Sequence, residues 1–399
     1  MRILIGGSPC TRWSIAQTKN RETEASGIGW ELFLNYRIAR DKYQPDFFLY
    51  ENNKSMSPAI RAQITAELGV EPALINSALV SAQNRQRLYW VGRRNPDGTY
   101  SQVAVEQPVD RGILLRDILE SGVCWKEKGY ALLSTTGGTT VDDMVSRQQR
   151  NGAAEPVAIK PLTEREMDYM FGEHGKYSNR WTYLQKPGEA DKALCITANV
   201  HRGVPYNICA EHVRIGTIEN DAKNQTFDSQ QYRVYSPDAK SVTLCGNGGG
   251  LGAKTGLYAV PVIPDGKGQF VIKAAGGKEI PVYEVRGGRI TIKGKTYPIK
   301  LADGFYIIRK LTVTECKRLQ TVPDTYAFPV SDTHAYKMLG NGWTVDVIAH
   351  IMSHFDGLRS EPVEVLSMYD GMSCGHIALD KLGAEITAYY ATEIDKYAI

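Results

Sequence analysis

The two ends of the chain share a pattern that constrains the fold more than any other feature. Short apolar runs alternate there with segments of helical periodicity, as at residues 3–5 and 47–50. The same alternation returns after residue 309, with predicted strands at 363–369 and 386–391. Apolar strands separated by amphipathic helices are typical of a parallel sheet with helices on both faces. We therefore predict an α/β fold built on a doubly wound, mostly parallel sheet.

The middle of the chain, from about residue 96 to 308, has a different texture. It is rich in glycine, and turn pairs such as Gly287-Gly288 separate alternating segments such as 289–292. That pattern predicts β-strands and loops. We expect a sheet domain formed by residues 1–95 and 309–399 that carries the middle region as an insertion.

Composition argues against several classes of protein. The chain has 399 residues, 42% hydrophobic and 23% charged, which suits a folded globular protein. No apolar run is long enough for a membrane span, and the first residues are too rich in glycine for a signal peptide, so we expect a cytoplasmic protein without a membrane partner. Its seven cysteines are scattered without a C-x-x-C pair, which argues against disulfides and against a metal site. A net charge of +3 is compatible with nucleic acid but does not demonstrate it.

A cysteine follows the first apolar run. The segment Gly6-Gly7-Ser8-Pro9-Cys10 would place a thiol just past the carboxyl end of a buried strand, where open α/β sheets have their active sites. A polar loop at residues 11–29 comes next. Cys10 is therefore a candidate nucleophile. The alternative is that Cys10 is simply a small buried apolar residue.

Charged residues stand at the ends of two further predicted strands. Glu51 ends the run at 47–50 and could keep a ring nitrogen protonated. Gln83, Arg85 and Arg87 share one face of an extended segment because strand side chains alternate. Two guanidinium groups on one face suit a phosphate or a carbonyl that gains negative charge. The alternative for this face is a solvated basic strand end.

The last two predicted strands have the arrangement of a nucleoside-cofactor site. The strand at 363–369 runs into Asp370-Gly371 and then a helix, and Glu393 follows the strand at 386–391. Glycine lets the backbone approach a ligand, and a carboxylate at the next strand end can accept hydrogen bonds from ribose hydroxyls. The alternative is a strand, turn and helix without a ligand.

Together these segments resemble the cytosine-C5 DNA methyltransferase family. Residues 7–10 are similar to its Pro-Cys nucleophile motif, 51–53 to its Glu-Asn-Val motif, and 83–87 to its Gln-x-Arg-x-Arg motif. In the last third of the chain, 318–324 resembles the motif that packs the recognition domain, 340–345 the Gly-Asn-Ser-Val motif at the cofactor, and 366–372 the Phe-x-Gly cofactor motif. Thr243 and the glycines at 248–250 look like a target-recognition loop.

The resemblance implies a class I S-adenosylmethionine-dependent methyltransferase fold. The catalytic domain would comprise residues 1–95 and 309–399, and residues 96–308 would form a target-recognition domain. The activity implied is methyl transfer from S-adenosyl-L-methionine to C5 of a cytosine flipped out of a specific duplex DNA sequence, by a monomer in a bacterial or phage-infected cell, as in restriction-modification systems.

The resemblance also assigns roles to individual residues. Cys10 would attack C6, Glu51 would bind N3 and the exocyclic amine, and Arg85 or Arg87 would steady the O2 edge or a flanking phosphate. The cofactor residues implied are Pro9, Asn341, Trp343, Tyr369, Asp370, Gly371, Met372, Glu393 and Ile394. The DNA-binding residues implied are Ser14, Gln83, Thr243, Gly248, Gly249 and Gly250.

The chain departs from the family pattern in its motif order. The cofactor strands come last instead of first, which is a circular permutation, and the family's helix and strand that follow the ribose-binding acid have no counterpart between Glu393 and the nucleophile motif. We expect weaker cofactor binding, or this piece supplied from elsewhere. Smaller departures are Thr11 for the usual Gln, Asn53 for Val, and Gly342-Trp343 for Ser-Val.

Three other functions are compatible with part of the pattern. One is cytosine methylation of RNA, although the long middle region favours duplex DNA. Another is a DNA-binding protein with weak or no catalysis, although Cys10, Glu51 and Arg87 are all present. The last is a thiol hydrolase, which the distance from Cys10 to the first histidine, His174, disfavours.

Overall fold

The computed structural model describes residues 1–9, 12–14, 21–147, 150–157 and 279–398, and short strands between 158 and 278. It divides into two compact units. Unit 1 comprises Met1–Ala153 and Arg309–Ile399, and unit 2 comprises Ala154–Ile308. Unit 1 thus continues past residue 95, where we expected the insertion to begin. The reason is that residues 96–153, which form short strands, turns and short helices, bury Leu115, Ile118 and Leu132 in the core of unit 1.

Unit 1 is built on one sheet with the strand order β21-β20-β1-β2-β5-β3, and β6 pairs with β5. Neighbours from β21 to β2 are parallel, whereas β5 is antiparallel to β2, β3 and β6. The prediction of a mostly parallel sheet is therefore confirmed. The strands are β1 (Arg2–Gly6), β2 (Phe47–Asn53), β3 (Pro72–Asn76), β5 (Gln86–Arg94), β6 (Tyr100–Gln102), β20 (Val363–Met368) and β21 (Ile386–Thr392); β4 (Gln83–Asn84) pairs with β7 (Gly129–Tyr130) outside this sheet.

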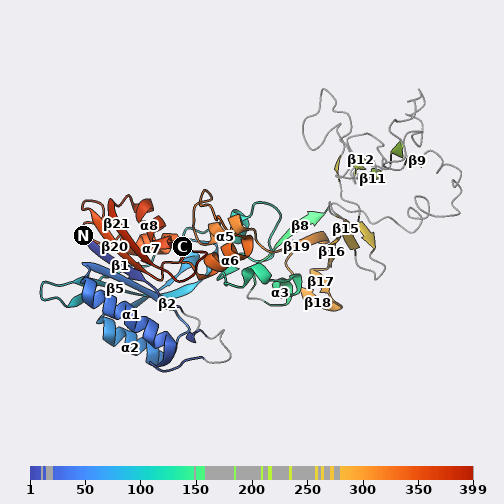
Figure 1. The fold of residues 1–399 in the computed structure, drawn as a ribbon. Helices are drawn as coiled ribbons and strands as arrows, with labels where there is room; N and C mark the ends of the chain where they lie inside the picture. Colours follow the sequence, from blue (N-terminus) through green and yellow to red (C-terminus); the bar gives the residue numbers. More distant parts are fainter. Residues whose placement is uncertain are drawn as a thin grey trace. The chain divides into compact units, whose positions relative to one another are not determined.

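Helices cover both faces of the sheet, as Figure 1 shows: α1 and α2 lie on one side, and α7 and α8 on the other. Leu4 of β1 packs in the core with α1 and α2, while its neighbours Ile3 and Ile5 face the other core. Gly375 of α8 is needed there, because a Cβ at this position would lie 2.2 Å from Cδ1 of Ile5. The helices are α1 (Gly27–Tyr43), α2 (Pro58–Leu68), α3 (Val141–Ser146), α5 (Val313–Leu319), α6 (Asp332–Asn341), α7 (Val345–Met352) and α8 (Cys374–Leu382).

Unit 2 has the β character that its sequence predicts. Its main sheet is largely antiparallel, and β16 and β17 are joined by Gly287-Gly288, whose φ angles of 58° and 67° suit a two-residue hairpin turn. The strands of this sheet are β8 (Ala153–Val157), β14 (Val262–Pro264), β15 (Phe270–Lys273), β16 (Glu279–Arg286), β17 (Arg289–Ile292), β18 (Lys295–Pro298) and β19 (Gly304–Arg309). The shorter strands are β9 (Leu184–Gln185), β10 (Ile208–Cys209), β11 (Arg214–Thr217), β12 (Arg233–Tyr235) and β13 (Leu257–Tyr258).

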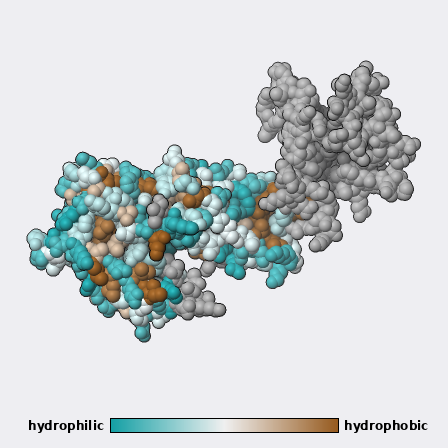
Figure 2. All heavy atoms as spheres, in the orientation of Figure 1, coloured by the Kyte–Doolittle hydropathy of each residue, from teal (hydrophilic) through white to brown (hydrophobic). Residues whose placement is uncertain are grey.

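The surface of unit 1 gives no sign of a membrane segment. On the face drawn in Figure 2, hydrophobic residues form small patches separated by hydrophilic ones. Among the described residues, no helix combines the length and the apolar character that a membrane span needs. The described part of the chain also holds no cluster of three or more His, Cys, Asp or Glu side chains suited to a metal ion.

Candidate active site

One edge of the sheet in unit 1 collects the candidate site residues. The parallel strands β1, β2, β20 and β21 all end there, and the antiparallel strand β5 begins there, since Asn53 pairs with Arg87. Glu51, Arg87 and the segment from Gly7 to Pro9 consequently lie at this edge, together with the turn after β20. Cys10 itself lies outside the described residues, one position beyond Pro9.

Glu51 is held by an ion pair at one oxygen and a hydrogen bond at the other. Its Oε1 forms a salt bridge with Nε of Arg87 at 3.0 Å, and its Oε2 accepts a hydrogen bond from Nε1 of Trp343 at 3.0 Å. The side chains of Glu51 and Arg87 are only 12% and 17% exposed. Gly7 packs directly on this group, because a Cβ there would lie 2.9 Å from the carbonyl oxygen of Glu51 and 3.0 Å from its Oε2. The carboxylate is thus fixed beside the end of β1.

A buried hydrogen-bond cluster holds the backbone just before Cys10. Nδ2 of Asn52 donates to the carbonyl oxygen of Ser8 at 3.2 Å, and the hydroxyls of Ser8 and Tyr50 lie 2.6 Å apart. Burial raises the pKa of Tyr50 well above its ordinary value, so Tyr50 is a neutral phenol. Asn52 is not among the predicted site residues, although a polar residue at the end of an otherwise apolar strand is a signal for such a role.

The loop after Cys10 is anchored at both ends. Trp13 is fully buried, its Nε1 donates to Oε2 of Glu22 at 3.1 Å, and the amide of Glu22 donates to the carbonyl oxygen of Arg12 at 2.9 Å. Ser14 lies next to this anchor and is half-buried. A DNA contact by Ser14 stays a prediction.

Arg85 does not face a ligand. It is buried, and its guanidinium donates to the carbonyl oxygens of Leu132, Gly340 and Gly342 at distances from 2.8 to 3.3 Å. The catalytic contact predicted for Arg85 is therefore not seen. Arg85 and Arg87 lie on the same face, as the alternation of strand side chains predicts. Residues 340–342, however, cover this face at Arg85.

Gln83 was predicted to bind DNA, but other segments of the chain cover its side chain too. It is fully buried, and its Nε2 donates to the carbonyl oxygen of Leu319 at 2.6 Å and to Oε1 of Gln320 at 2.8 Å. Leu132 donates its amide to Oε1 of Gln83. A residue packed in this way cannot reach DNA, so Gln83 positions the surrounding backbone. The other predicted DNA-binding residues, Thr243, Gly248, Gly249 and Gly250, lie outside the described residues.

The turn after β20 has an unusual backbone. Tyr369, Gly371 and Ser373 have φ angles of 59°, 58° and 58°. Non-glycine residues adopt this left-handed conformation at a cost of about 1 kcal/mol. The amide of Gly371 donates to Oε2 of Glu393 at 2.7 Å, and Oε1 of Glu393 accepts from the amides of Ile394 and Asp395. The predicted cofactor turn and the predicted ribose-binding acid therefore meet.

The remaining predicted cofactor residues surround this turn or lie at the same edge. The carboxylate of Asp370 accepts hydrogen bonds from the hydroxyls of Ser367, Ser373 and Tyr389. Met372 is buried, and Gly342 packs against it. Pro9, Asn341 and Ile394 are exposed, with Ile394 95% exposed.

These residues have the chemistry that a nucleoside cofactor requires. Glu393 offers carboxylate oxygens for ribose hydroxyls, the space around Gly371 is open because a Cβ would meet no atom within 4 Å, and Ile394 presents an apolar side chain to solvent. Cys374, at the start of the following helix, is not a nucleophile. Burial raises the pKa of its thiol to about 12.

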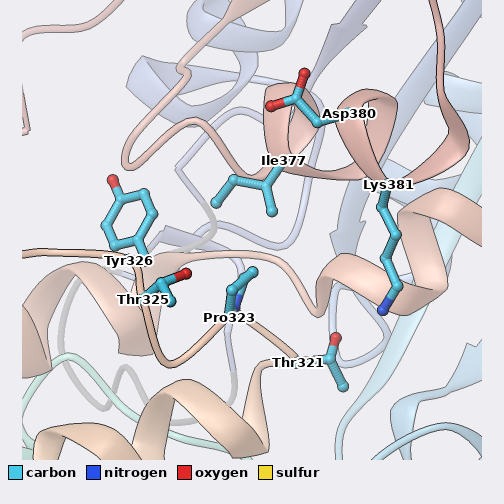
Figure 3. Close-up of a pocket in the computed structure, with 7 residues that line it drawn as sticks. All are labelled: Thr321, Pro323, Thr325, Tyr326, Ile377, Asp380 and Lys381. Carbon is cyan, nitrogen blue, oxygen red and sulfur yellow. The ribbon is translucent and has the colours of Figure 1, made fainter.

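A pocket elsewhere in unit 1 contains none of the predicted site residues. It measures about 490 Å³ and lies between the segment after α5 and helix α8, as Figure 3 shows. Lys381 at its rim is bonded to the buried carboxylate of Asp346. The lining residues are Thr321, Pro323, Thr325, Tyr326, Ile377, Asp380 and Lys381.

The chain matches one family model and is similar to several known methyltransferases. The family model described as "C-5 cytosine-specific DNA methylase" matches residues 1–248 and 279–356. The orphan methyltransferase M.SPRI of Bacillus phage SPR is 24% identical over 88% of this chain and 81% of its own length. The type II methyltransferase M.HpaII of Haemophilus parainfluenzae is 38% identical, over 23% of this chain and 25% of its own. Among solved structures, the Entamoeba histolytica methyltransferase EhMeth has a TM-score of 0.37 and 12% identity, covering 90% of this chain and 78% of that one.

Proposed function

The chain belongs to the C-5 cytosine-specific DNA methylase family, and from that premise we propose that it methylates C5 of a cytosine flipped out of a specific duplex DNA sequence, with S-adenosyl-L-methionine as methyl donor. One observation carries the proposal. Glu51, Arg87 and the backbone leading to Cys10 meet at one sheet edge, and the glycine turn beside Glu393 lies at the same edge.

The first step proposed is addition of the Cys10 thiolate to C6 of the cytosine. A carbon–sulfur bond forms, and the electron pair of the C5–C6 bond moves toward C5, which by itself is a poor nucleophile. Glu51 binds N3 and the exocyclic amine and so stabilises the adduct, while Arg87 keeps Glu51 in place and steadies the O2 edge.

The second step proposed is methyl transfer followed by release. S-Adenosyl-L-methionine, when bound, would supply an electrophilic methyl group, whose bond to the sulfonium sulfur breaks to leave the neutral thioether S-adenosylhomocysteine. Glu393 and the backbone at Gly371 would hold its ribose, with Tyr369 and Ile394 beside them. After transfer, the proton on C5 leaves to a base, the C5–C6 double bond re-forms, and the Cys10 thiolate departs.

We assign target recognition to unit 2, with Thr243 and the glycines at 248–250 as contacts. Flipping a base costs a few kcal/mol, which contacts to the DNA must offset. Ser14 and the loop after Cys10 are the further candidates for such contacts. The relative M.SPRI comes from a phage, which favours action in a bacterial or phage-infected cell, and the type II relative favours a link to restriction-modification.

A circularly permuted motif order forms part of this proposal. The family model leaves residues 357–399 unmatched, and these contain β20 and β21. Yet β20 pairs in parallel with β1, with Ile3 opposite Val365. This arrangement supports the view that the cofactor strands, although last in sequence, occupy their usual place beside the nucleophile strand.

Capture of the covalent adduct tests the function. The protein is incubated with S-adenosyl-L-methionine and a long duplex of mixed sequence that contains 5-fluorocytosine. Fluorine at C5 cannot leave as a proton does, so the adduct accumulates and shifts the protein on a denaturing gel. We expect the shift with the wild type and with Cys124→Ser, and its loss with Cys10→Ser. DNA binding without any adduct would favour the alternative of a DNA-binding protein without catalysis.

A further inference from the structure

We propose that Trp343 is a positioning residue for Glu51, in addition to any contact it makes with the cofactor. This inference rests on the proposed function, because it assigns Trp343 to the step carried by Glu51. The observation behind it is the hydrogen bond from Nε1 of Trp343 to Oε2 of Glu51, 3.0 Å long, between residues 292 positions apart in sequence.

The contact is specific to the side chain found in this sequence. In the family motif that residues 340–345 resemble, valine is usual at this position, and valine has no side-chain donor. The indole also packs at the nucleophile segment, since a Cβ on Gly7 would lie 3.5 Å from Cζ2 of Trp343. The tryptophan therefore bonds to the carboxylate and lies close to the backbone before Cys10.

The backbone that presents Trp343 is itself fixed. Arg85 donates to the carbonyl oxygens of Gly340 and Gly342, and Gln320 donates to that of Gly342 at 3.1 Å. Gly340 leaves no room for movement toward its neighbour, because a Cβ there would lie 2.3 Å from the carbonyl carbon of Leu133. A rigid backbone gives the indole N–H a defined position.

An ion pair at one oxygen and a hydrogen bond at the other hold the Glu51 carboxylate. Nε of Arg87 lies 3.0 Å from Oε1, and Nε1 of Trp343 donates to one lone pair of Oε2, which keeps a second lone pair. The exocyclic amine of cytosine can use this second lone pair without displacing Trp343. Loss of the Trp343 donor leaves Arg87 as the single anchor, and the carboxylate can then rotate away from the base.

The test uses a readout that needs no methyl donor. Addition of a thiolate at C6 lets C5 exchange its hydrogen with water, so tritium is released from duplex DNA labelled at cytosine C5. Chromosomal DNA labelled in this way contains every short recognition sequence. The variants are Trp343→Phe, which keeps an aromatic ring and loses the N–H, and Trp343→Val, which has the usual family residue.

Trp90→Phe is the matched control. Nε1 of Trp90 donates to Oγ1 of Thr65, also at 3.0 Å, within the core that packs α1 and α2. This variant therefore loses an equivalent hydrogen bond at a place without a role in the reaction. Melting temperatures of all variants show whether each of them folds.

We expect Trp343→Phe and Trp343→Val to release tritium about tenfold more slowly than the wild type at saturating DNA, the size of one hydrogen bond to a charged group. Trp90→Phe should exchange at the wild-type rate. In a Glu51→Gln background, Trp343→Phe should add little, because both changes affect one contact.

Two results would overturn the inference. Normal tritium release by folded Trp343→Phe, with a raised KM for S-adenosyl-L-methionine, would restrict Trp343 to the cofactor. An equal additional loss in the Glu51→Gln background would show that Trp343 acts independently of Glu51. A wild-type protein that releases no tritium would instead refute the proposed function itself, and the inference with it.

Discussion

The candidate site has two halves that differ in construction: a base half at the ends of β1, β2 and β5, and a cofactor half at the ends of β20 and β21. Around β1, β2 and β5, buried side chains contact one another across long stretches of sequence, as Glu51 does with Trp343. Around β20 and β21, the site is formed by a turn with positive φ angles and by the bond from the amide of Gly371 to the carboxylate of Glu393, 22 positions away. The first half suits a reaction that needs fixed side-chain geometry. The second suits a ligand that enters and leaves.

The largest effect expected is on the base half. Glu51→Gln keeps the shape of the side chain but removes the charge that pairs with Arg87 and that, in the proposed function, would bind protonated N3. Methyl transfer and tritium release should both fall by about 10²–10⁴-fold, the usual contribution of a general acid or base. The exposed Glu71→Gln serves as control. If Glu51→Gln only raised KM for the methyl donor and left both rates unchanged, the division into a base half and a cofactor half would be contradicted.

Arg85 and Arg87 allow a comparison within one motif. Arg85→Met removes the guanidinium that donates to the carbonyl oxygens of Leu132, Gly340 and Gly342, of which the last keeps a donor in Gln320, so we expect a loss of about 3 kcal/mol in the free energy of unfolding. Arg87→Met should lower the rate much more than the stability, because Arg87 is partly exposed and bonded to Glu51. Urea denaturation and tritium release measure the two effects. Equal stability losses in both variants would show that Arg87 is also a structural residue.

In the cofactor half, Glu393→Ala should change affinity more than rate. We expect KM for S-adenosyl-L-methionine to rise about tenfold, because the carboxylate holds the amide of Gly371 and, in the proposed function, would also accept hydrogen bonds from the ribose. Tritium release without methyl donor should stay near the wild-type value. A matching fall in tritium release would mean that the two halves are not separable.

The smallest effect expected is a pH dependence of stability. Burial alone would raise the pKa of Glu315, but hydrogen bonds from Arg309 and from the amides of Glu120 and Thr312 lower it below 4.5. Its stabilising contribution is therefore present above pH 4.5 and is lost as the pH falls through the lowered pKa. Melting temperatures of the wild type and of Glu315→Gln should converge on acidification. A constant gap between them would argue against this assignment.

The sequence predicts the fold better than it predicts the site. Alternating apolar runs identify the parallel strands, because a strand buried on both faces has to be apolar throughout. The direction of a strand has no comparable sequence signature, so the antiparallel orientation of β5 was not predicted. Alternation also placed Gln83, Arg85 and Arg87 on one face correctly, but it cannot show what covers a face. The segments that cover Gln83 and Arg85 lie more than two hundred positions later, at residues 319–320 and 340–342.

The place of β1 in the sheet has a consequence for synthesis on the ribosome. On one side, the backbone of β1 pairs with β2, which follows soon after in the sequence. On the other side it pairs with β20, with Ile3 opposite Val365. Until residues 363–368 emerge, that edge of an apolar strand has unpaired backbone groups. Such an edge is a template for aggregation. This side of β1 therefore stays unpaired during synthesis for longer than in a protein whose central strands are neighbours in sequence.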